Sequence, residues 1–309
     1  MRLPLFINAI RHGLFVGLTA LFCLPHAQAE SEADTYRVAF YNLQNYLEMD
    51  RTIEGERLEN HPKPEDEIVS LVNTIQNLDA DILGLCEIGT EADLADLQER
   101  LKQAGLDYPH TEYGGGDDTT RRLAILSRFP IVERNSRSDL PYQLNGRIMR
   151  MQRGILDATI DLPNDAFIRC LVVHFKSKRP VPEGEALMRR NEAQITRRHV
   201  SAIFRQDPEV LLLLMGDLND TKNEPAVQEV QGELNSATSL QDLPLADALG
   251  DRWTHHWKYA DLYSRIDFLM VSRPLHDHFL LDQSGVWRPE DGLIGSDHRP
   301  VYATFKLNP

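Results

Sequence analysis

The sequence has few cysteines and no apolar segment long enough to cross a membrane. Only 3 of its 309 residues are cysteine, and Cys23 lies in an N-terminal segment that we expect to be removed. Cys86 and Cys170 each lie inside an apolar, strand-like run, where we favour two buried thiols and leave a disulfide open. Two cysteines without histidines at ligand spacing exclude a structural zinc site.

Basic residues are also scarce, because 33 Lys and Arg stand against 47 Asp and Glu and give a net charge of -14. This charge excludes a general electrostatic attraction to nucleic acid or anionic lipid, but it is compatible with a local basic region. With 42% hydrophobic and 26% charged residues, the composition is ordinary for a globular protein. It excludes the collagen-like and disordered classes.

Residues 1–29 have the pattern of a secretory signal peptide. Arg2 and Arg11 precede an apolar run over residues 13–24, and Ala27-Gln28-Ala29 supplies a small-x-small cleavage site. The apolar run is shorter than the roughly 20 residues of a spanning helix. We therefore expect export to the periplasm or the extracellular space, with no stable membrane association after cleavage.

Residues 30–309 are expected to form one α/β domain, which we take as a monomer by default. Helical patterns cover residues 68–75, 94–101 and 183–204, and Gly105 is a plausible stop for the second. Many strands with few intervening helices predict two packed sheets with helices outside. The strand-like runs are 36–41, 82–86, 123–126, 154–160, 168–173, 210–215, 266–271 and 301–305.

Several of these runs end in, or contain, a polar residue that suits a phosphate or metal site. Asp217 to Asp220, taken alone, is best explained as an Asp- and Asn-rich turn after a buried strand. Asp267 lies inside an apolar run, where an unpaired carboxylate would be costly to bury. Asn42, Glu87 and His174 end three other runs, and Asp297 and His298 precede the last run.

Taken in chain order, from Asn42 to His298, these motifs resemble those of the endonuclease/exonuclease/phosphatase superfamily. The resemblance extends from about Arg37 to Phe305, with one departure at Cys86, where a Gln often precedes the metal-binding Glu. It implies a four-layered α/β sandwich with two mixed sheets, and hydrolysis of phosphoesters that depends on a divalent metal. Glu87 would be the principal ligand of Mg²⁺, or of Mn²⁺, with help from Asn42 or Asp297.

The resemblance also implies roles for five further residues. Asp267 would pair with His298 and fix its tautomer, while Asp217 would activate or orient the attacking water. Asn219 would donate to a phosphate oxygen, and His174 would hold phosphate or protonate the leaving oxygen. Whether Asp217 or the Asp267–His298 pair is the base stays open.

The substrate is less defined by the sequence. Lys176, Lys178 and Arg179 directly follow His174, so we expect them to contact the substrate phosphate. No aromatic-rich hairpin of the kind that a lipid-acting relative presses into a membrane is visible. Four aromatic residues before Asp267 either stack on a base or sugar or pack in the core: Trp253, Trp257, Tyr259 and Tyr263.

These observations favour a secreted, metal-dependent phosphoester hydrolase, in first place a nuclease or related phosphodiesterase. The alternative is a phosphomonoesterase, or a phospholipid or sphingomyelin phosphodiesterase, of the same superfamily. A non-catalytic binding domain that kept the fold is a remote third reading, because every motif residue retains its acid, amide or imidazole group.

The first prediction concerns the N-terminus. Protein recovered from the exporting host should begin at Glu30, because the small-x-small site ends at Ala29. Mass spectrometry of the intact protein checks this. An uncleaved species that begins at Met1 and fractionates with membranes would contradict it.

Overall fold

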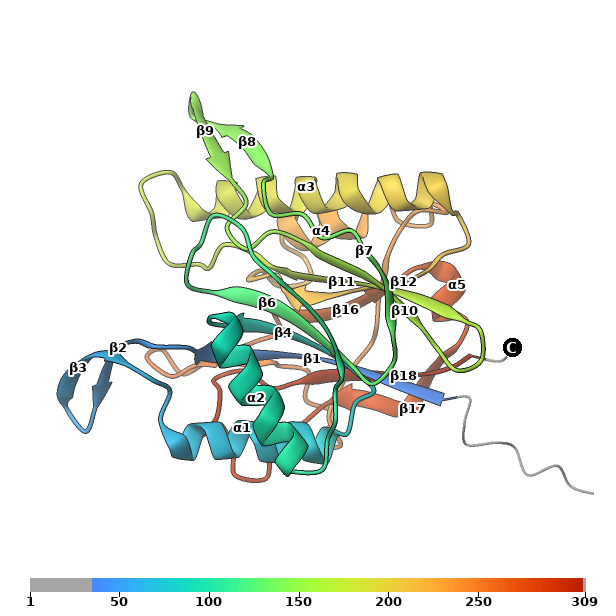
Figure 1. The fold of residues 1–309 in the computed structure, drawn as a ribbon. Helices are drawn as coiled ribbons and strands as arrows, with labels where there is room; N and C mark the ends of the chain where they lie inside the picture. Colours follow the sequence, from blue (N-terminus) through green and yellow to red (C-terminus); the bar gives the residue numbers. More distant parts are fainter. Residues whose placement is uncertain (1–34, 308–309) are drawn as a thin grey trace, which may run out of the picture. The chain divides into compact units, whose positions relative to one another are not determined.

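Two six-stranded mixed sheets pack face to face in the computed structural model, which describes residues 35–307 (Figure 1). The predicted signal peptide, residues 1–29, and the boundary after it lie outside the described residues. The first sheet has the order β17 (Phe279–Val286), β18 (Val301–Lys306), β1 (Thr35–Tyr46), β4 (Ile82–Ile88), β6 (Arg122–Ser127) and β5 (His110–Gly114). The second has the order β13 (Gln241–Asp242), β16 (Asp267–Val271), β12 (Leu211–Asp217), β11 (Phe167–His174), β10 (Leu156–Asp161) and β7 (Ile131–Arg134).

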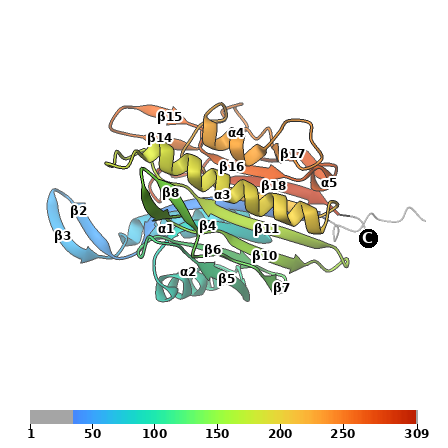
Figure 2. The ribbon, with the colours of Figure 1, turned by 90° about the horizontal axis from the view of Figure 1, so that it is seen from above.

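Helices cover the outer face of each sheet, as seen in Figures 1 and 2. On the first sheet lie α1 (Glu65–Leu78) and α2 (Glu91–Gln103). On the second lie α3 (Glu185–Gln206) and α4 (Pro225–Gln231), while the short α5 (Arg273–His276) follows β16. This is the four-layered α/β sandwich that the sequence predicts. No helix in the described part of the chain is both long and apolar enough to span a membrane.

Strand alternation divides the apolar residues between the layers. In β1, Val38 and Phe40 point between the two sheets, whereas Ala39 and Tyr41 pack under α1 and α2. Because both faces of each central strand are covered, the strands read as continuous apolar runs. Gly84 lets the sheets approach closely, since a Cβ there would lie 2.5 Å from Met215 Sδ on the facing sheet.

The eight predicted strands and three predicted helices are confirmed within a few residues. Thr90 caps α2 through a capping box with Asp93, and Gly105, at φ +92°, follows the C-cap as expected. Cys86 and Cys170 are buried free thiols, as we favoured. Three hairpins were not predicted: β2 (Met49–Ile53) with β3 (Glu56–His61), β8 (Pro141–Leu144) with β9 (Arg147–Arg150), and β14 (His255–Trp257) with β15 (Leu262–Ser264).

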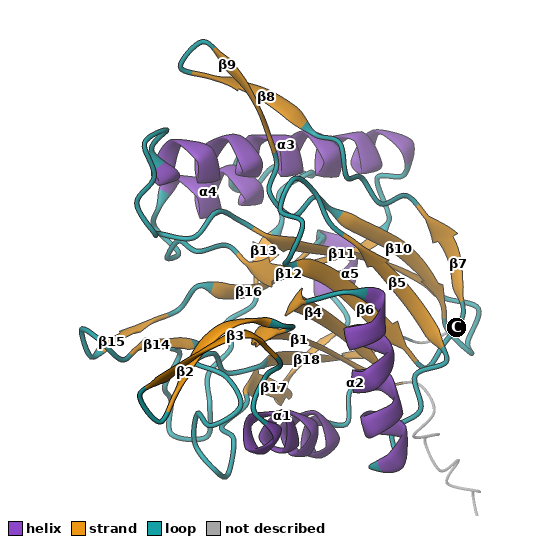
Figure 3. Cartoon of the chain, turned by 60° about the vertical axis from the view of Figure 1, so that its left-hand side comes forward, coloured by secondary structure: helices purple, strands orange, loops and turns teal. Residues whose placement is uncertain are grey.

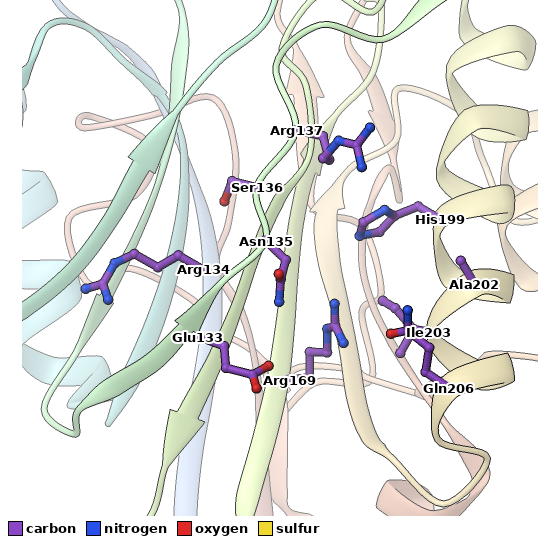
Figure 4. A pocket seen from close by; sticks show the side chains of 10 residues that line it. All are labelled: Glu133, Arg134, Asn135, Ser136, Arg137, Arg169, His199, Ala202, Ile203 and Gln206. Atoms are coloured by element: carbon purple, nitrogen blue, oxygen red, sulfur yellow. The ribbon is translucent and has the colours of Figure 1, made fainter.

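A polar pocket of about 690 Å³ lies between α3 and the second sheet (Figure 4). Beneath it, the fully buried Asp157 accepts hydrogen bonds of 2.7 Å from Arg169 Nε, Arg169 Nη2 and His199 Nε2. Burial alone would raise the pKa of Asp157, but these hydrogen bonds outweigh it and lower the pKa below its ordinary value. None of the predicted site residues lines this pocket, so we assign the network to stability.

Asp157→Asn should lower the free energy of unfolding by about 3 kcal/mol, because it leaves the largely buried Arg169 without its anion. Urea denaturation followed by circular dichroism measures this difference. Since folding lowers the pKa of Asp157, the deficit of the variant should be full above about pH 4 and should shrink as the pH falls below it.

Asp139→Asn is the matched control, because Asp139 forms an exposed ion pair with Arg150 and should contribute less than about 1 kcal/mol. Equal stability of the two variants would contradict the role of Asp157.

Candidate active site

Strand direction brings the predicted polar residues to one end of the sandwich. In the second sheet, His174 pairs with Asp217 across β11 and β12, and Asp217 pairs with Asp267 across β12 and β16. In the first sheet, Asn42 lies near the end of β1, and its amide Nδ2 donates to Asp217 Oδ2 at 3.1 Å across the interface. The carboxyl ends of the parallel pairs β1–β4 and β11–β12 therefore meet at this point.

The same alternation that builds the core points these side chains inward. Asn42 continues the inward-facing series of Val38 and Phe40, and Asp217 continues that of Leu213 and Met215. Glu87 would face outward by this count. It instead has φ of 62° in a register shift between β4 and β6, a bulge that redirects its side chain to within 3.9 Å of His174 Nε2.

His298 and Asp267 form a buried pair, with 2.8 Å between His298 Nδ1 and Asp267 Oδ2. Asp267 is held in place by Thr254, whose hydroxyl oxygen accepts from the Asp267 backbone N–H at 3.1 Å. Ser296 Oγ accepts from the His298 N–H at 3.0 Å and donates to the Asn42 carbonyl at 2.8 Å. These contacts fix the ring of His298 with Nε2 directed toward Asp217 Oδ2, 3.8 Å away.

Burial and neighbouring charges shift the pKa values of three titratable side chains of the site. Burial and the neighbouring Asp267 charge raise the pKa of Asp217 to about 7, although His298 opposes this. Burial would lower the pKa of His298, but Asp267, Asp217 and Asp297 together raise it to about 10. For His174 the pKa is well below its ordinary value, because the ring is buried and cationic side chains lie near it. His174 is therefore a neutral imidazole.

The remaining predicted residues differ in how they face the site. Asn219 donates from its backbone N–H to Asp217 Oδ1 at 2.9 Å and from its amide to the Phe175 carbonyl at 3.0 Å. Lys176 is buried, and its ammonium group donates to the Ser177 and Arg179 carbonyls. Lys178 is engaged by Glu224 at 3.0 Å. Of the three predicted phosphate contacts, only Arg179 has no side-chain partner in the described chain.

Two groups of side chains in the described chain could hold a cation: His255, Asp297 and His298, and Asp217, Asp267 and His298. Neither group includes Glu87, the ligand implied by the resemblance, and Asp297 is the only predicted ligand found in them. Glu87 accepts no hydrogen bond within the described chain, and Asp267 Oδ1 is buried without a partner. Carboxylates that lack donors suit a divalent ion, so the residues present fit a metal.

Sequence reasoning missed Thr254 and His255. The His255 ring lies 4.6 Å from the His298 ring, and its Nε2 lies 3.7 Å from Asp297 Oδ2. The sequence did not indicate an aromatic-rich hairpin, and the β14–β15 hairpin corrects this expectation. Beside the site it carries four exposed aromatic or apolar side chains: Trp257, Tyr259, Leu262 and Tyr263. Only Trp253 packs inward, under Arg299.

The sequence matches the Endonuclease/Exonuclease/phosphatase family over residues 39–298, which contain every residue of this site. The chain belongs to this family. Its members are phosphoester hydrolases, and the family typically uses a divalent metal. The match confirms the family that the order of the motifs indicated. The chemical roles of the individual residues stay predictions.

Solved structures of low sequence identity share the fold. The human Nocturnin catalytic domain with bound sulfate is 16% identical, with a TM-score of 0.61 over 88% of this chain and 94% of its own. Truncated TDP2 of Caenorhabditis elegans is 19% identical, with a TM-score of 0.59 over 88% and 98%. A family protein of Bacteroides vulgatus is 17% identical, with a TM-score of 0.61 over 89% and 99%. No curated protein matches the sequence.

The buried pair generates a prediction for hydrolysis of a model phosphodiester. His298→Ala and Asp267→Asn should each lower kcat by about 10²–10⁴, the usual contribution of general acid–base catalysis. The double variant should lose little more than the worse single variant, because the two residues act as one unit. Steady-state kinetics measure this, with circular dichroism to confirm the fold. Multiplicative losses would show that the residues act independently.

Proposed function

We propose that this protein is an exported, divalent-metal-dependent phosphodiesterase of the nuclease type. The observation that carries the proposal is the fixed network of Asn42, Asp217, Asp267 and His298 beside carboxylates that lack donors. Burying such like charges together destabilises the fold unless a cation compensates them, so the arrangement supports a metal at this site. The Asp267–His298 pair supports proton transfer beside it. Export rests on the signal-like pattern of residues 1–29.

Glu87 would hold the metal, with Asp297 as a further ligand, and His255 beside Asp297 would set the orientation of that carboxylate. When bound, the metal would neutralise charge on the phosphoryl oxygens and stabilise the leaving oxygen. Glu87 suits this position because its carboxylate is reachable at the mouth of the site, with a side chain that is 16% exposed.

His298 would move the proton. The surrounding carboxylates hold the pKa of His298 at about 10, so its ring can act as a base only when a bound cation offsets their charge. Nδ1 faces the Asp267 carboxylate and keeps its hydrogen, so in the neutral ring Nε2 would be the atom that takes a proton from the attacking water. Asp267 would stabilise the imidazolium that results. Asp217 and the Asn42 amide, 3.8 Å and 3.4 Å from Nε2, border the position where that water would be held.

His174 would stabilise the phosphoryl group rather than act as a base. Its low pKa keeps the ring neutral, and Nδ1 is buried without a partner, while Nε2 lies 3.6 Å from Asp217 Oδ2. A neutral imidazole donates one hydrogen bond without the cost of burying a charge. Asn219, fixed by the Phe175 carbonyl, keeps a second amide hydrogen for the substrate.

Metal removal tests the proposal. Treatment with chelator should abolish hydrolysis of single-stranded DNA and of a small phosphodiester, and Mg²⁺ or Mn²⁺ should restore it, because charge neutralisation depends on the ion. Glu87→Gln should raise the Mg²⁺ concentration needed for half-maximal activity, and Glu91→Gln, on the exposed first turn of α2, should not. Full activity after thorough metal stripping would refute metal dependence.

A further inference from the structure

The β14–β15 hairpin projects from the body of the sandwich (Figure 3). Its large apolar side chains are exposed to solvent. Its base is joined to the site, because the His256 N–H donates to the Asp297 carbonyl at 3.0 Å and the Arg299 N–H donates to the Thr254 carbonyl at 2.6 Å. Trp257 is 51% exposed and Leu262 is 54% exposed. Exposed apolar surface near the site is available to be buried against a ligand, which would be favourable.

The register shows which side chains share a face. His255 pairs with Ser264, His256 with Tyr263, and Trp257 with Leu262. Because side chains alternate along a strand, His255, Trp257 and Leu262 lie on one face of the hairpin, and His256 and Tyr263 on the other. The stacking of His256 on Tyr263, with ring centroids 4.2 Å apart, agrees with this division.

The His255 face continues outward from the catalytic histidine. The rings of His255 and His298 are 4.6 Å apart, and Trp257 lies two residues, or about 7 Å of strand, farther along the same face. A group attached next to the scissile phosphate would therefore lie against Trp257 and Leu262. An aromatic ring paired with an aliphatic side chain suits a flat, apolar ligand.

The charged residues of the hairpin and of the site argue against a membrane and against duplex DNA as the ligand. Asp261 lies in the turn with its side chain 83% exposed, and a bilayer would have to bury this carboxylate with the hairpin tip. The net charge of -14 further opposes anionic membranes. Duplex DNA requires several phosphate contacts. Of the three cationic side chains that follow His174, Lys176 and Lys178 are engaged by the protein, which leaves Arg179.

We infer that the His255 face of the β14–β15 hairpin, made by His255, Trp257 and Leu262, stacks on an unpaired nucleobase attached next to the scissile phosphate. This inference rests on the proposed function and narrows its substrate to single-stranded nucleic acid or a nucleotide. Stacking compensates for the weak electrostatic attraction, since each base–aromatic contact contributes favourable energy without any fixed cation.

Kinetics on matched strands test the inference. Wild-type protein with Mg²⁺ should cleave a single-stranded thymidine decamer at lower KM than a decamer of the same length without bases. Trp257→Ala should raise KM for the thymidine strand by about 5- to 100-fold, the range for one stacked base, and leave kcat nearly unchanged. Trp257→Phe should restore most of the loss. A thymidine dinucleotide, assayed in parallel, distinguishes a strand from a small nucleotide as the source of the base.

Tyr259→Ala is the matched control, because Tyr259 is an aromatic residue of the same hairpin, 83% exposed, in the turn outside the paired strands. It should leave both kinetic constants unchanged. Cosedimentation with vesicles of phosphatidylcholine and phosphatidylglycerol should show no binding. Vesicle binding that Tyr259→Ala abolishes would replace the inference with membrane insertion.

Binding without turnover separates this inference from the proposed function. Fluorescence anisotropy with the His298→Ala variant should show tighter binding of the labelled thymidine strand than of the strand without bases, and Trp257→Ala in that background should remove the difference. Equal affinity for the two strands would overturn the inference even if hydrolysis is efficient. Absence of hydrolysis on every phosphoester, with the affinity difference retained, would instead overturn the proposed function alone.

Discussion

The burial of several carboxylates where two sheets meet is the constraint on which the rest of this structure depends. Asp217 and Asp267 are each almost fully buried and lie opposite each other across one strand pair. Their repulsion is relieved within the protein mainly by His298, whose pKa rises to about 10 in response. A cation would complete the compensation. The electrostatic cost of burying these carboxylates together is thus the physical reason to expect an ion there.

The sandwich can tolerate this electrostatic cost because its central strands are packed on both faces up to that end. Both faces of β1, β4, β11 and β12 are covered, and Gly84 brings the two sheets close just before the site begins. The site residues then extend the inward-facing series of core side chains by one step. Polar groups placed on strand ends in this way lose little conformational entropy when they bind substrate.

Much of this site could be predicted because it follows the strand periodicity, and the motif order supplied the family. The two-residue spacing of Val38, Phe40 and Asn42 is visible in the sequence. It predicts that the Asn42 side chain points to the same face of the strand as the two core side chains. Glu87 breaks that alternation through a backbone bulge with positive φ, which no residue pattern announces. Strands of three residues, as in β14 and β15, are too short to show alternation, so the hairpin and His255 were missed. Lys176 was assigned to the substrate because sequence does not show that an ammonium group folds back on its own loop.

The net negative charge of the chain and the carboxylates of the site both oppose the binding of an anionic substrate. A phosphoester must approach a site with Asp217, Asp267 and Asp297 around one imidazole, on a protein with a net charge of -14. Long-range attraction cannot supply the affinity, because the field of the protein opposes an anion. Affinity would then come from short-range contacts at the site: the proposed metal, and contacts that do not depend on charge. The exposed Trp257 and Leu262 lie on the face that leads to His298, and by our inference they supply contacts of the second kind.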